Sequence, residues 1–454
     1  MRGSYFSASP HAPPDRRRRI RSPVPGPDTI RNAAVDDTMT DAARRVQRTY
    51  LLLTLLSTLS ASFIWGINTL FLLDAGLSNG EAFAANAFFT AGMVVFEVPT
   101  GALADTWGRR ASYLLGAATL LGSTLLYLAM WQAHAPLWGW AIASVLLGLG
   151  FTFFSGATEA WLVDALAASG YRESLESVMA RGQVAGGAAM LVGSVAGGMI
   201  AQATNLGVPY IIRSVCLGLT LVTAFFLMKD EGFTPDRSTG PLEEVRRVVR
   251  ASLDSGWRNP PVRWLMLAAL CTGGVTTFAF YALQPYLLQL YGDPKAFGIA
   301  GLAAAIVAGT EMVAGVLAAQ VRRLFARRST ALIVLTAVGI ACLALMGTTR
   351  SFPLAIALLV VWGLTFSATV PIRQAYLNGI LRSRERATVL SFDNLMSSAG
   401  GVAAQPALGR AADVWGYPAA YVLSAGIQLV ALPFLALARR ERATSDSIDQ
   451  RPVA

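Results

Sequence analysis

We select as candidates seven ionisable side chains inside long apolar stretches of the sequence, where a charged group is energetically expensive. Such a group is usually paired with an opposite charge or is part of a functional site. A carboxylate there can bind a proton, and a pair of opposite charges can hold two helices together until protonation weakens it. These seven residues are Glu97, Glu159, Asp164, Arg181, Glu311, Arg373 and Asp393.

Two of the acids, Glu97 and Glu311, occur in the same local pattern, four residues before Gly101 and Gly315. Each could bind a proton, because an ionised carboxylate is costly in apolar surroundings. Each could equally accept hydrogen bonds from nearby backbone or serine groups, and we favour this structural role for both. Glu311 is the better candidate for proton coupling because its immediate neighbours offer no cation. Asp393 near the start of its apolar run is a further candidate.

The stretches that hold these residues are long enough to cross a membrane. The chain has 454 residues, of which 54% are hydrophobic and 14% charged, and its mean hydropathy is +0.49. Crossing a hydrocarbon core takes about 20 apolar residues. The sequence lacks the alternating pattern of a membrane β-barrel, so it predicts an all-α integral membrane protein. Twelve apolar runs lie near 50–73, 81–103, 110–131, 137–164, 177–202, 208–228, 263–290, 297–321, 329–348, 352–380, 387–411 and 418–438.

The net charge of +10 is explained by membrane topology and not by binding to nucleic acid. If every run spans, nearly all of the basic clusters fall on one side of the membrane. Excess Lys and Arg marks the cytoplasmic side, so both termini are expected there, in the inner or plasma membrane. The basic clusters are at 16–19, 44–48, 109–110, 246–250, 322–328, 382–386 and 439–442.

Cysteine and histidine offer little for catalysis. Cys216, Cys271 and Cys342 are scattered within apolar runs without metal-ligand spacing, so neither a metal site nor a structural disulfide is expected. The sequence contains no nucleophile–base pair and no phosphate-binding loop. We therefore expect no cofactor and no enzymatic activity.

A short loop between the second and third runs carries the most specific motif. Its sequence is Gly101-Ala-Leu-Ala-Asp105-Thr-Trp-Gly108-Arg109-Arg110. It resembles the G-x-L-A-D-x-x-G-R-[RK] loop of the major facilitator superfamily (MFS) of secondary transporters. The resemblance implies twelve transmembrane helices in two pseudo-symmetric six-helix bundles that alternate between inward-facing and outward-facing states.

The resemblance also implies a gate at this loop. In the family, the acid meets the N-terminus of helix eleven, where the helix dipole favours a negative charge. The arginine pairs with an acid at the inner end of helix four, where Asp164 stands in this chain. The contact would hold the outward-facing state. Ala319 replaces Asp105 in the second copy, so the gate is expected to be asymmetric. Alternatively, the charges of the loop only set topology.

The two halves of the sequence repeat. Glu97-x-x-x-Gly101-x-Leu-Ala recurs from Glu311 at an offset of 214, and two further matches have offsets of 215 and 209. Two such repeats around a central cavity are a transporter architecture. The expected domains are a disordered tail (1–48), a first bundle (49–228), a linker with an amphipathic helix (229–262), a second bundle (263–440) and a cytoplasmic tail (441–454). Met39 is a candidate for the true start.

Glu159 and Arg373 occupy neighbouring positions in the two repeats. Helices four and ten both line the central cavity in the family, so a bridge between these two charges could close its inner end. Protonation of Glu159 would then weaken the bridge. Alternatively, each charge pairs within its own half, for example Glu159 with Arg181. The sequence leaves both interpretations open.

Aromatic and amide side chains on the cavity-lining helices predict a pocket for amphiphilic compounds, although aromatic residues near span ends are often interfacial anchors. We therefore expect a monomeric, proton-coupled exporter of small amphiphilic molecules, acting in the lipid bilayer. The alternatives are a narrow-specificity metabolite carrier and a non-transporting sensor. Ser194 and Ser144 depart from the motifs of drug/proton antiporters, so that resemblance is partial. The pocket candidates are Trp65, Asn68, Trp161, Phe278, Tyr281, Gln284, Trp362, Gln374 and Tyr376.

Overall fold

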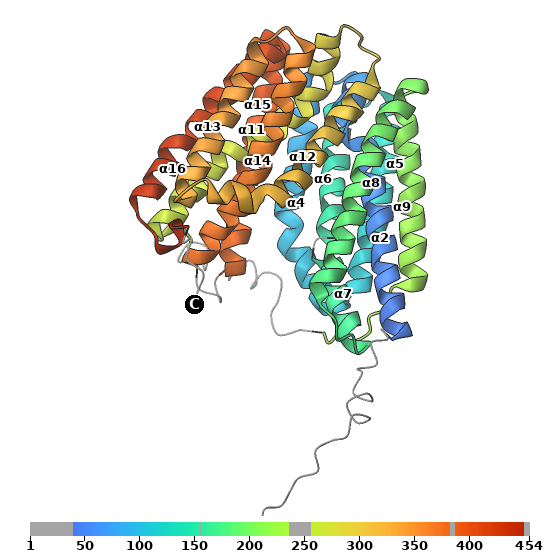
Figure 1. Cartoon of the computed structure of the whole chain (residues 1–454). Helices are drawn as coiled ribbons and strands as arrows, with labels where there is room; N and C mark the ends of the chain where they lie inside the picture. Colours follow the sequence, from blue (N-terminus) through green and yellow to red (C-terminus); the bar gives the residue numbers. More distant parts are fainter. Residues whose placement is uncertain (1–39, 155, 236–255, 382–385, 449–454) are drawn as a thin grey trace, which may run out of the picture. The chain divides into compact units, whose positions relative to one another are not determined.

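The computed structural model describes residues 40–154, 156–235, 256–381 and 386–448. The chain divides into two units, Met1–Thr40 and Asp41–Ala454, and the second unit is the helical bundle considered below. Figure 1 shows its first-half helices in blue to green beside its second-half helices in yellow to red.

The first half consists of helices that correspond to the six predicted runs. They are α2 (Asp41–Trp65), α3 (Asn68–Asp74), α4 (Asn79–Trp107), α5 (Arg109–Ala133), α6 (Leu137–Phe154), α7 (Ala157–Ala168), α8 (Leu175–Ala203) and α9 (Gly207–Leu227). The first span is bent by 51° between α2 and α3. The fourth span is interrupted between α6 and α7, where Gly156 has a φ of +70°.

The second half repeats this arrangement. It contains α11 (Pro260–Tyr291), α12 (Phe297–Arg323), α13 (Arg328–Thr348), α14 (Phe352–Ile380), α15 (Arg386–Leu429), α16 (Ala431–Arg440) and the short 3₁₀ helix η2 (Thr444–Asp446). Gly416, with φ +82° and ψ +166°, breaks α15 where the chain turns back. With this break and the bent first span counted, the described residues contain the twelve predicted spans.

Two of the predicted boundaries change. The N-terminal tail was expected to reach residue 48, but α2 begins at Asp41. The extra two turns are helical because Ala43 and Gln47 are buried against the bundle. The amphipathic helix expected near residues 242–253 lies outside the described residues. The predicted C-terminal tail contributes η2, which packs against the bundle through the buried Asp446.

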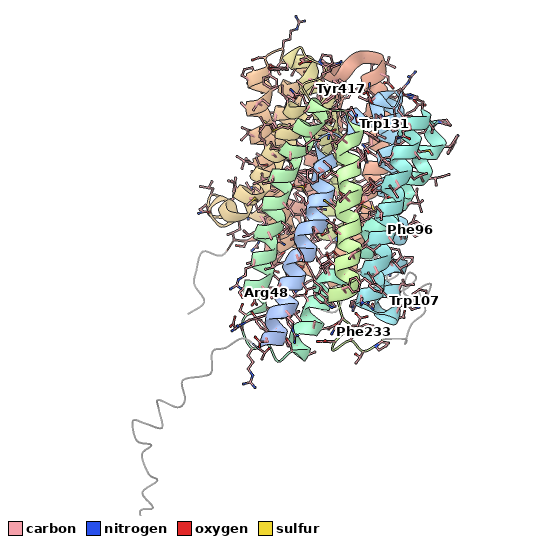
Figure 2. The ribbon with its side chains drawn as sticks, turned by 90° about the vertical axis from the view of Figure 1, so that its right-hand side faces the viewer. Arg48, Phe96, Trp107, Trp131, Phe233 and Tyr417 are labelled. Carbon is pink, nitrogen blue, oxygen red and sulfur yellow. The ribbon has the colours of Figure 1, made fainter. Side chains whose placement is uncertain are left out.

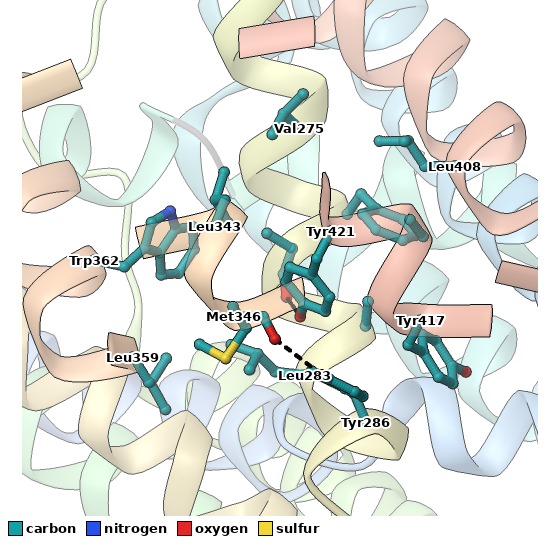
Figure 3. Packing of buried hydrophobic residues seen from close by; sticks show 14 of the residues in the cluster. Val275, Leu283, Tyr286, Leu343, Met346, Leu359, Trp362, Leu408, Tyr417 and Tyr421 are labelled. Carbon is teal, nitrogen blue, oxygen red and sulfur yellow. Dashed lines mark hydrogen bonds between the residues drawn. The ribbon is translucent and has the colours of Figure 1, made fainter. Parts of the chain in front are cut away.

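The core of the second half is apolar and contains tyrosines whose hydroxyl groups are satisfied by backbone carbonyls. Tyr286 donates to the carbonyl of Met346 at 2.9 Å, and Tyr421 donates to that of Ala279 at 2.7 Å. Figure 3 shows these rings packed among aliphatic side chains. A buried hydroxyl without a partner would destabilise the core, so these bonds fix the spacing of α11, α13 and α15.

The two halves approach most closely where glycines meet. A Cβ atom on Gly301 of α12 would lie 2.4 Å from the carbonyl oxygen of Ser194 and 3.0 Å from the Cα of Gly198, both on α8. On the other side of α8, a Cβ on Gly197 would lie 2.0 Å from the carbonyl oxygen of Phe63. The small residues of α8 thus serve close helix packing.

This close approach predicts that a single methyl group at Gly301 destabilises the protein. Overpacking costs about 1–3 kcal/mol, so Gly301→Ala should lower the melting temperature of the purified protein in detergent. Gly122 on α5 is the matched control, because a Cβ atom there would meet nothing within 4 Å. Gly122→Ala should be neutral or stabilising by roughly 0.5–1 kcal/mol, as expected for a helix interior. Equal effects of the two substitutions would contradict the packing argument.

Candidate functional site

The loop between α4 and α5 has a conformation that only glycine accepts readily. Gly108 ends α4 with φ +109°, a backbone angle that disfavours other residues. A Cβ there would also lie 2.4 Å from a carboxylate oxygen of Asp230. Asp105 and Arg109 form an ion pair of 2.6 Å across the loop, and the Asp105 side chain is half exposed. The predicted gate residues Gly101, Asp105, Gly108, Arg109 and Arg110 are thus grouped at one end of the bundle, called here the Arg109 end.

The partners of this loop differ from those that the family resemblance implies. Arg109 pairs with Asp105 and not with Asp164, and within the described residues Asp105 makes no polar contact with α15. The predicted contacts are absent because Arg109 turns back toward its own loop, where it also lies over the ring of Phe233.

A residue that the sequence analysis missed, Asp230, caps the start of α5. Its carboxylate accepts a hydrogen bond of 2.8 Å from the backbone N–H of Arg110, at the positive end of the helix. The Arg110 side chain donates to the carbonyl of Phe225 at 2.7 Å. The segment after the sixth span is therefore fixed to the gate loop.

The second half contains the equivalent cap. Asp446 in η2 accepts hydrogen bonds of 2.8 Å from both the backbone N–H and the hydroxyl of Ser329, at the start of α13. Arg328 donates to the carbonyls of Ser445 and Ser447. Asp446 follows Asp230 by nearly the offset of the sequence repeat, so each half holds its third span with a carboxylate that follows its sixth.

At the opposite end of the bundle, a carboxylate joins the two halves. Asp413 of α15 accepts hydrogen bonds from the backbone N–H groups of Asn79, at 2.8 Å, and Gly80, at 2.9 Å, in the first turn of α4. The hydroxyl of Tyr417 donates to the side-chain oxygen of Asn79. We call this opposite end the Asp413 end.

Further hydrogen bonds between the halves lie toward the same end. The side chain of Gln284 on α11 donates to the carbonyl of Trp65 and accepts from the N–H of Thr69, both at 2.8 Å. Gly298 donates to the side chain of Gln202 at 2.9 Å. In Figure 2, Tyr417 and Trp131 mark the Asp413 end, whereas Arg48, Trp107 and Phe233 lie toward the Arg109 end.

A cavity of about 230 Å³ lies within the second half, between α11, α13, α14 and α15. Its wall contains an ion pair in which Arg373 donates to Asp393 at 2.5 Å, and the same nitrogen donates to the carbonyl of Leu265 at 2.8 Å. Asp393 is buried. Two of the predicted pocket residues, Trp362 and Gln374, also line this cavity.

The rest of the lining combines an apolar surface with small polar groups. Phe366 stacks with Trp362, with ring centroids 6.0 Å apart. Gln428 contributes a buried carbonyl oxygen that has no hydrogen-bond partner. Threonine, serine and asparagine side chains complete the wall. They are Thr272, Thr276, Thr336, Thr365, Thr369, Asn394 and Ser397.

Among the described residues, the bridge between Glu159 and Arg373 is absent, and Arg373 pairs within its own half, as the alternative interpretation expects. Arg373 is engaged by Asp393, and within the described residues Glu159 forms no ion pair with Arg373 or with Arg181. The reason is geometric, because α14 and α15 belong to the same half and bring Arg373 and Asp393 together. The side chains of Glu97, Glu159, Arg181 and Glu311 are exposed.

The other predicted pocket residues are spread over several places. Trp65 stacks on Phe280 at 4.5 Å beside the half-buried Tyr281, and Phe278 packs against Phe83. Gln284 lies at the junction of the halves described above. Three others are buried elsewhere: Asn68 binds Asn86, Tyr376 donates to the carbonyl of Ala438, and Trp161 donates to that of Lys229.

The sequence analysis also missed Arg213, a fully buried cation on α9. Its guanidinium donates to the hydroxyl of Thr124 at 3.0 Å and to the carbonyl of Ser60 at 3.2 Å. Among its contacts within the described residues there is no carboxylate. The neighbouring rings of Tyr127 and Tyr210 surround it. Its position inside an apolar run was a signal that could have identified it.

Two six-helix halves around polar, charge-containing sites are the architecture of a membrane transporter. The model of the Major Facilitator Superfamily matches residues 50–326 and 297–453. The chain therefore belongs to the Major Facilitator Superfamily and is a multi-pass membrane transporter of small molecules. A search of curated proteins found no match.

Solved structures of transporters share the fold. The nucleoside transporter NupG has a TM-score of 0.72 and 10% identity, covering 88% of this chain and 99% of that one. A bacterial homologue of the human lysosomal transporter Spinster, in an inward-facing and unoccupied conformation, has a TM-score of 0.68 and 14% identity, covering 92% and 100%. A POT family transporter in complex with a thioalcohol-conjugated peptide has a TM-score of 0.66 and 12% identity, covering 87% and 96%.

The cap at α13 predicts that the C-terminal segment stabilises the second half. Loss of a helix-capping carboxylate costs about 0.5–2 kcal/mol, so Asp446→Ala should lower the melting temperature in detergent. Ser447→Ala is the matched control, because only the main chain of Ser447 contacts Arg328. If both variants melted like the wild type, the segment would not be contributing to stability.

Proposed function

We propose that this transporter couples proton movement to the export of small amphiphilic compounds, by alternating access and as a monomer. The observation that supports this most is the Arg373–Asp393 ion pair in the wall of the second-half cavity. The same cavity offers aromatic surface beside hydroxyl and amide groups. Such a lining suits molecules with both an apolar and a polar part.

The Arg373–Asp393 pair provides a simple coupling device. An ion pair in low dielectric is broken when one partner becomes neutral, because the remaining charge has lost its counterion. A proton on Asp393 would release Arg373 and loosen the contact between α14 and α15. Glu97, Glu159 and Glu311 are exposed although they lie in apolar spans. This supports a water-filled path from the cavity to the Arg109 end.

The contacts at the two ends of the bundle support alternating access. The Asp413 end is joined by carboxylate–amide bonds between the halves, whereas, within the described residues, Asp105 pairs with Arg109 of its own loop. This arrangement fits a state that is open at the Arg109 end. In the opposite state, Asp105 would reach the N-terminus of α15 and Asp413 would leave α4.

The sequence supports matching roles for Asp105 and Asp413. Gly101-x-x-Ala-Asp105-x-Trp-Gly108 at the end of α4 has the same pattern as Gly409-x-x-Ala-Asp413-x-Trp-Gly416 at the break of α15. Each acid lies near the end of one helix, in position to cap the start of a helix in the other half. The positive-inside distribution of arginines supports an orientation with the Arg109 end and both termini on the cytoplasmic side of the inner or plasma membrane.

This exchange of contacts predicts opposite effects for the two acids. A carboxylate at a helix N-terminus contributes about 0.5–2 kcal/mol, which shifts a two-state equilibrium by roughly 2- to 30-fold. Asp413→Ala should depopulate the state that is open at the Arg109 end, and Asp105→Ala should enrich it. The measurement is the distance between spin labels placed across that end on α4 and α15.

The control for this pair is Asp293→Ala, because Asp293 is exposed at the Asp413 end and bonds only locally to Lys295. It should leave the distance distribution unchanged. A shift in the same direction for Asp105→Ala and Asp413→Ala would rule out the proposed exchange.

The coupling proposal predicts separate effects on coupling and on transport. We expect Asp393→Asn to reduce accumulation of lipophilic dyes and antibiotics driven by a pH gradient in inverted vesicles at least ten-fold. Exchange of preloaded substrate without a gradient should continue, because the neutral amide mimics the protonated acid. Asp293→Asn is again the control. Gradient-driven accumulation that survives in Asp393→Asn would place coupling elsewhere.

A narrow-specificity metabolite carrier is the second candidate. The cavity of about 230 Å³ is smaller than the roughly 300–1,000 Å³ of sites for drug-sized ligands. Its many hydroxyl groups would also suit a polar metabolite. If no amphiphile accumulates with the gradient while a small metabolite does, this candidate replaces export of amphiphiles.

A further inference from the structure

A second cavity lies at the Arg109 end, on the first half of the bundle, between α2, α7 and α9. It has a volume of about 440 Å³, and we call it the basic groove. Its cations are Arg45 and Arg48 on α2, together with Lys229 just after α9. Its apolar surface includes Leu52 and Phe226. The groove is separate from the cavity that contains Arg373 and Asp393.

Among the described residues, the cations of the basic groove outnumber its acids. Its lining contains one acid, Glu231, against the three cations. Within the described residues, Arg45, Arg48 and Lys229 form no ion pair. Arg45 and Arg48 are three residues apart on a helix, so they lie on the same face. The three cations therefore provide a local excess of positive charge suited to an anion.

The backbone of the groove is fixed at Lys229 by a hydrogen bond from the bundle. The indole N–H of the buried Trp161 on α7 donates to the carbonyl of Lys229 at 2.7 Å. Helix α9 ends at Leu227, two residues before Lys229. The neighbouring Phe226 is 69% exposed. The positive groups and the exposed apolar side chains thus adjoin one another at the end of two membrane-spanning helices.

We propose that the basic groove binds an anionic phospholipid. The phosphate of the headgroup lies between Arg45, Arg48 and Lys229, and an acyl chain runs along Leu52 and Phe226. Leu52 is 39% exposed one turn further into the span than Arg48. A spanning helix exposes such side chains to acyl chains, and basic pockets between helices at the membrane surface hold anionic headgroups. This inference requires only that α2 and α9 cross a membrane. It does not depend on the proposed substrate or on proton coupling.

The phosphate chemistry alone would also suit free inorganic phosphate. The apolar side of the groove favours the lipid, because Phe226 and Leu52 offer nothing to a small inorganic ion. Each cation near a membrane surface strengthens the binding of an anionic lipid about five-fold. Removing two arginines should therefore weaken binding on the order of 30-fold.

The test is native mass spectrometry of the delipidated full-length protein with phosphatidylglycerol, phosphatidylcholine or inorganic phosphate. We expect retention of one phosphatidylglycerol in preference to phosphatidylcholine, and no displacement by millimolar phosphate. Arg45→Ala/Arg48→Ala should lose this preference about 30-fold. The matched control Arg44→Ala/Arg172→Ala removes the same charge at the same end, from residues outside the groove.

A second variant keeps the proposal testable if the double arginine variant does not fold. Phe226→Ser retains every cation and should weaken phosphatidylglycerol binding while leaving its preference over phosphatidylcholine unchanged. Three results would overturn the proposal: equal binding of the two lipids, equal loss in the groove and control variants, or full displacement by phosphate. Loss of transport in any variant would bear on the proposed function and not on this lipid site.

Discussion

Helix N-termini leave amide N–H groups without partners, and the bundle depends on carboxylates from other segments to satisfy them. Asp230 and Asp446 serve helices within their own halves, so each half is held as a unit. Asp413 instead serves a helix of the other half. A cap within a half is permanent as long as the half is folded. A cap between halves can be exchanged if the halves move, so under the proposed alternating access this difference would separate the rigid parts of the molecule from the part that moves.

Buried charge follows the same division between fixed and switchable contacts. Arg213 is satisfied by a hydroxyl and a carbonyl, which do not titrate near neutral pH, so its environment is constant. Arg373 is held by Asp393, a group that can become neutral by taking up a proton. Breaking a buried pair by neutralising one partner is costly for the charge that remains. The first cation therefore has fixed partners, while under the proposed coupling the second would respond to a proton on Asp393.

The twelve spans could be predicted because each one is a long apolar run. The sequence left open that Arg373 pairs within its own half, but it did not identify Asp393 as the partner, because the two residues lie 20 apart on successive helices and the repeat drew attention to Glu159. Asp230 and Asp446 escaped notice because they lie in polar segments, where an acid carries no hydropathy signal. The Asp105 loop was recognisable from its residues, but the pairing of Arg109 with Asp105 differs from the contacts that the resemblance implied.

The similarity of the two end motifs bears on how a single proton could switch the molecule. If Asp105 and Asp413 each contribute a cap of similar strength, the two states of the bundle have nearly equal free energies. A ligand shifts such an equilibrium only by its difference in affinity for the two states. Under the proposed coupling, a small difference between the states means that neutralising the pair between Arg373 and Asp393 would be enough to change the dominant state. Matched caps at the two ends would then make a modest charge change in the cavity decisive.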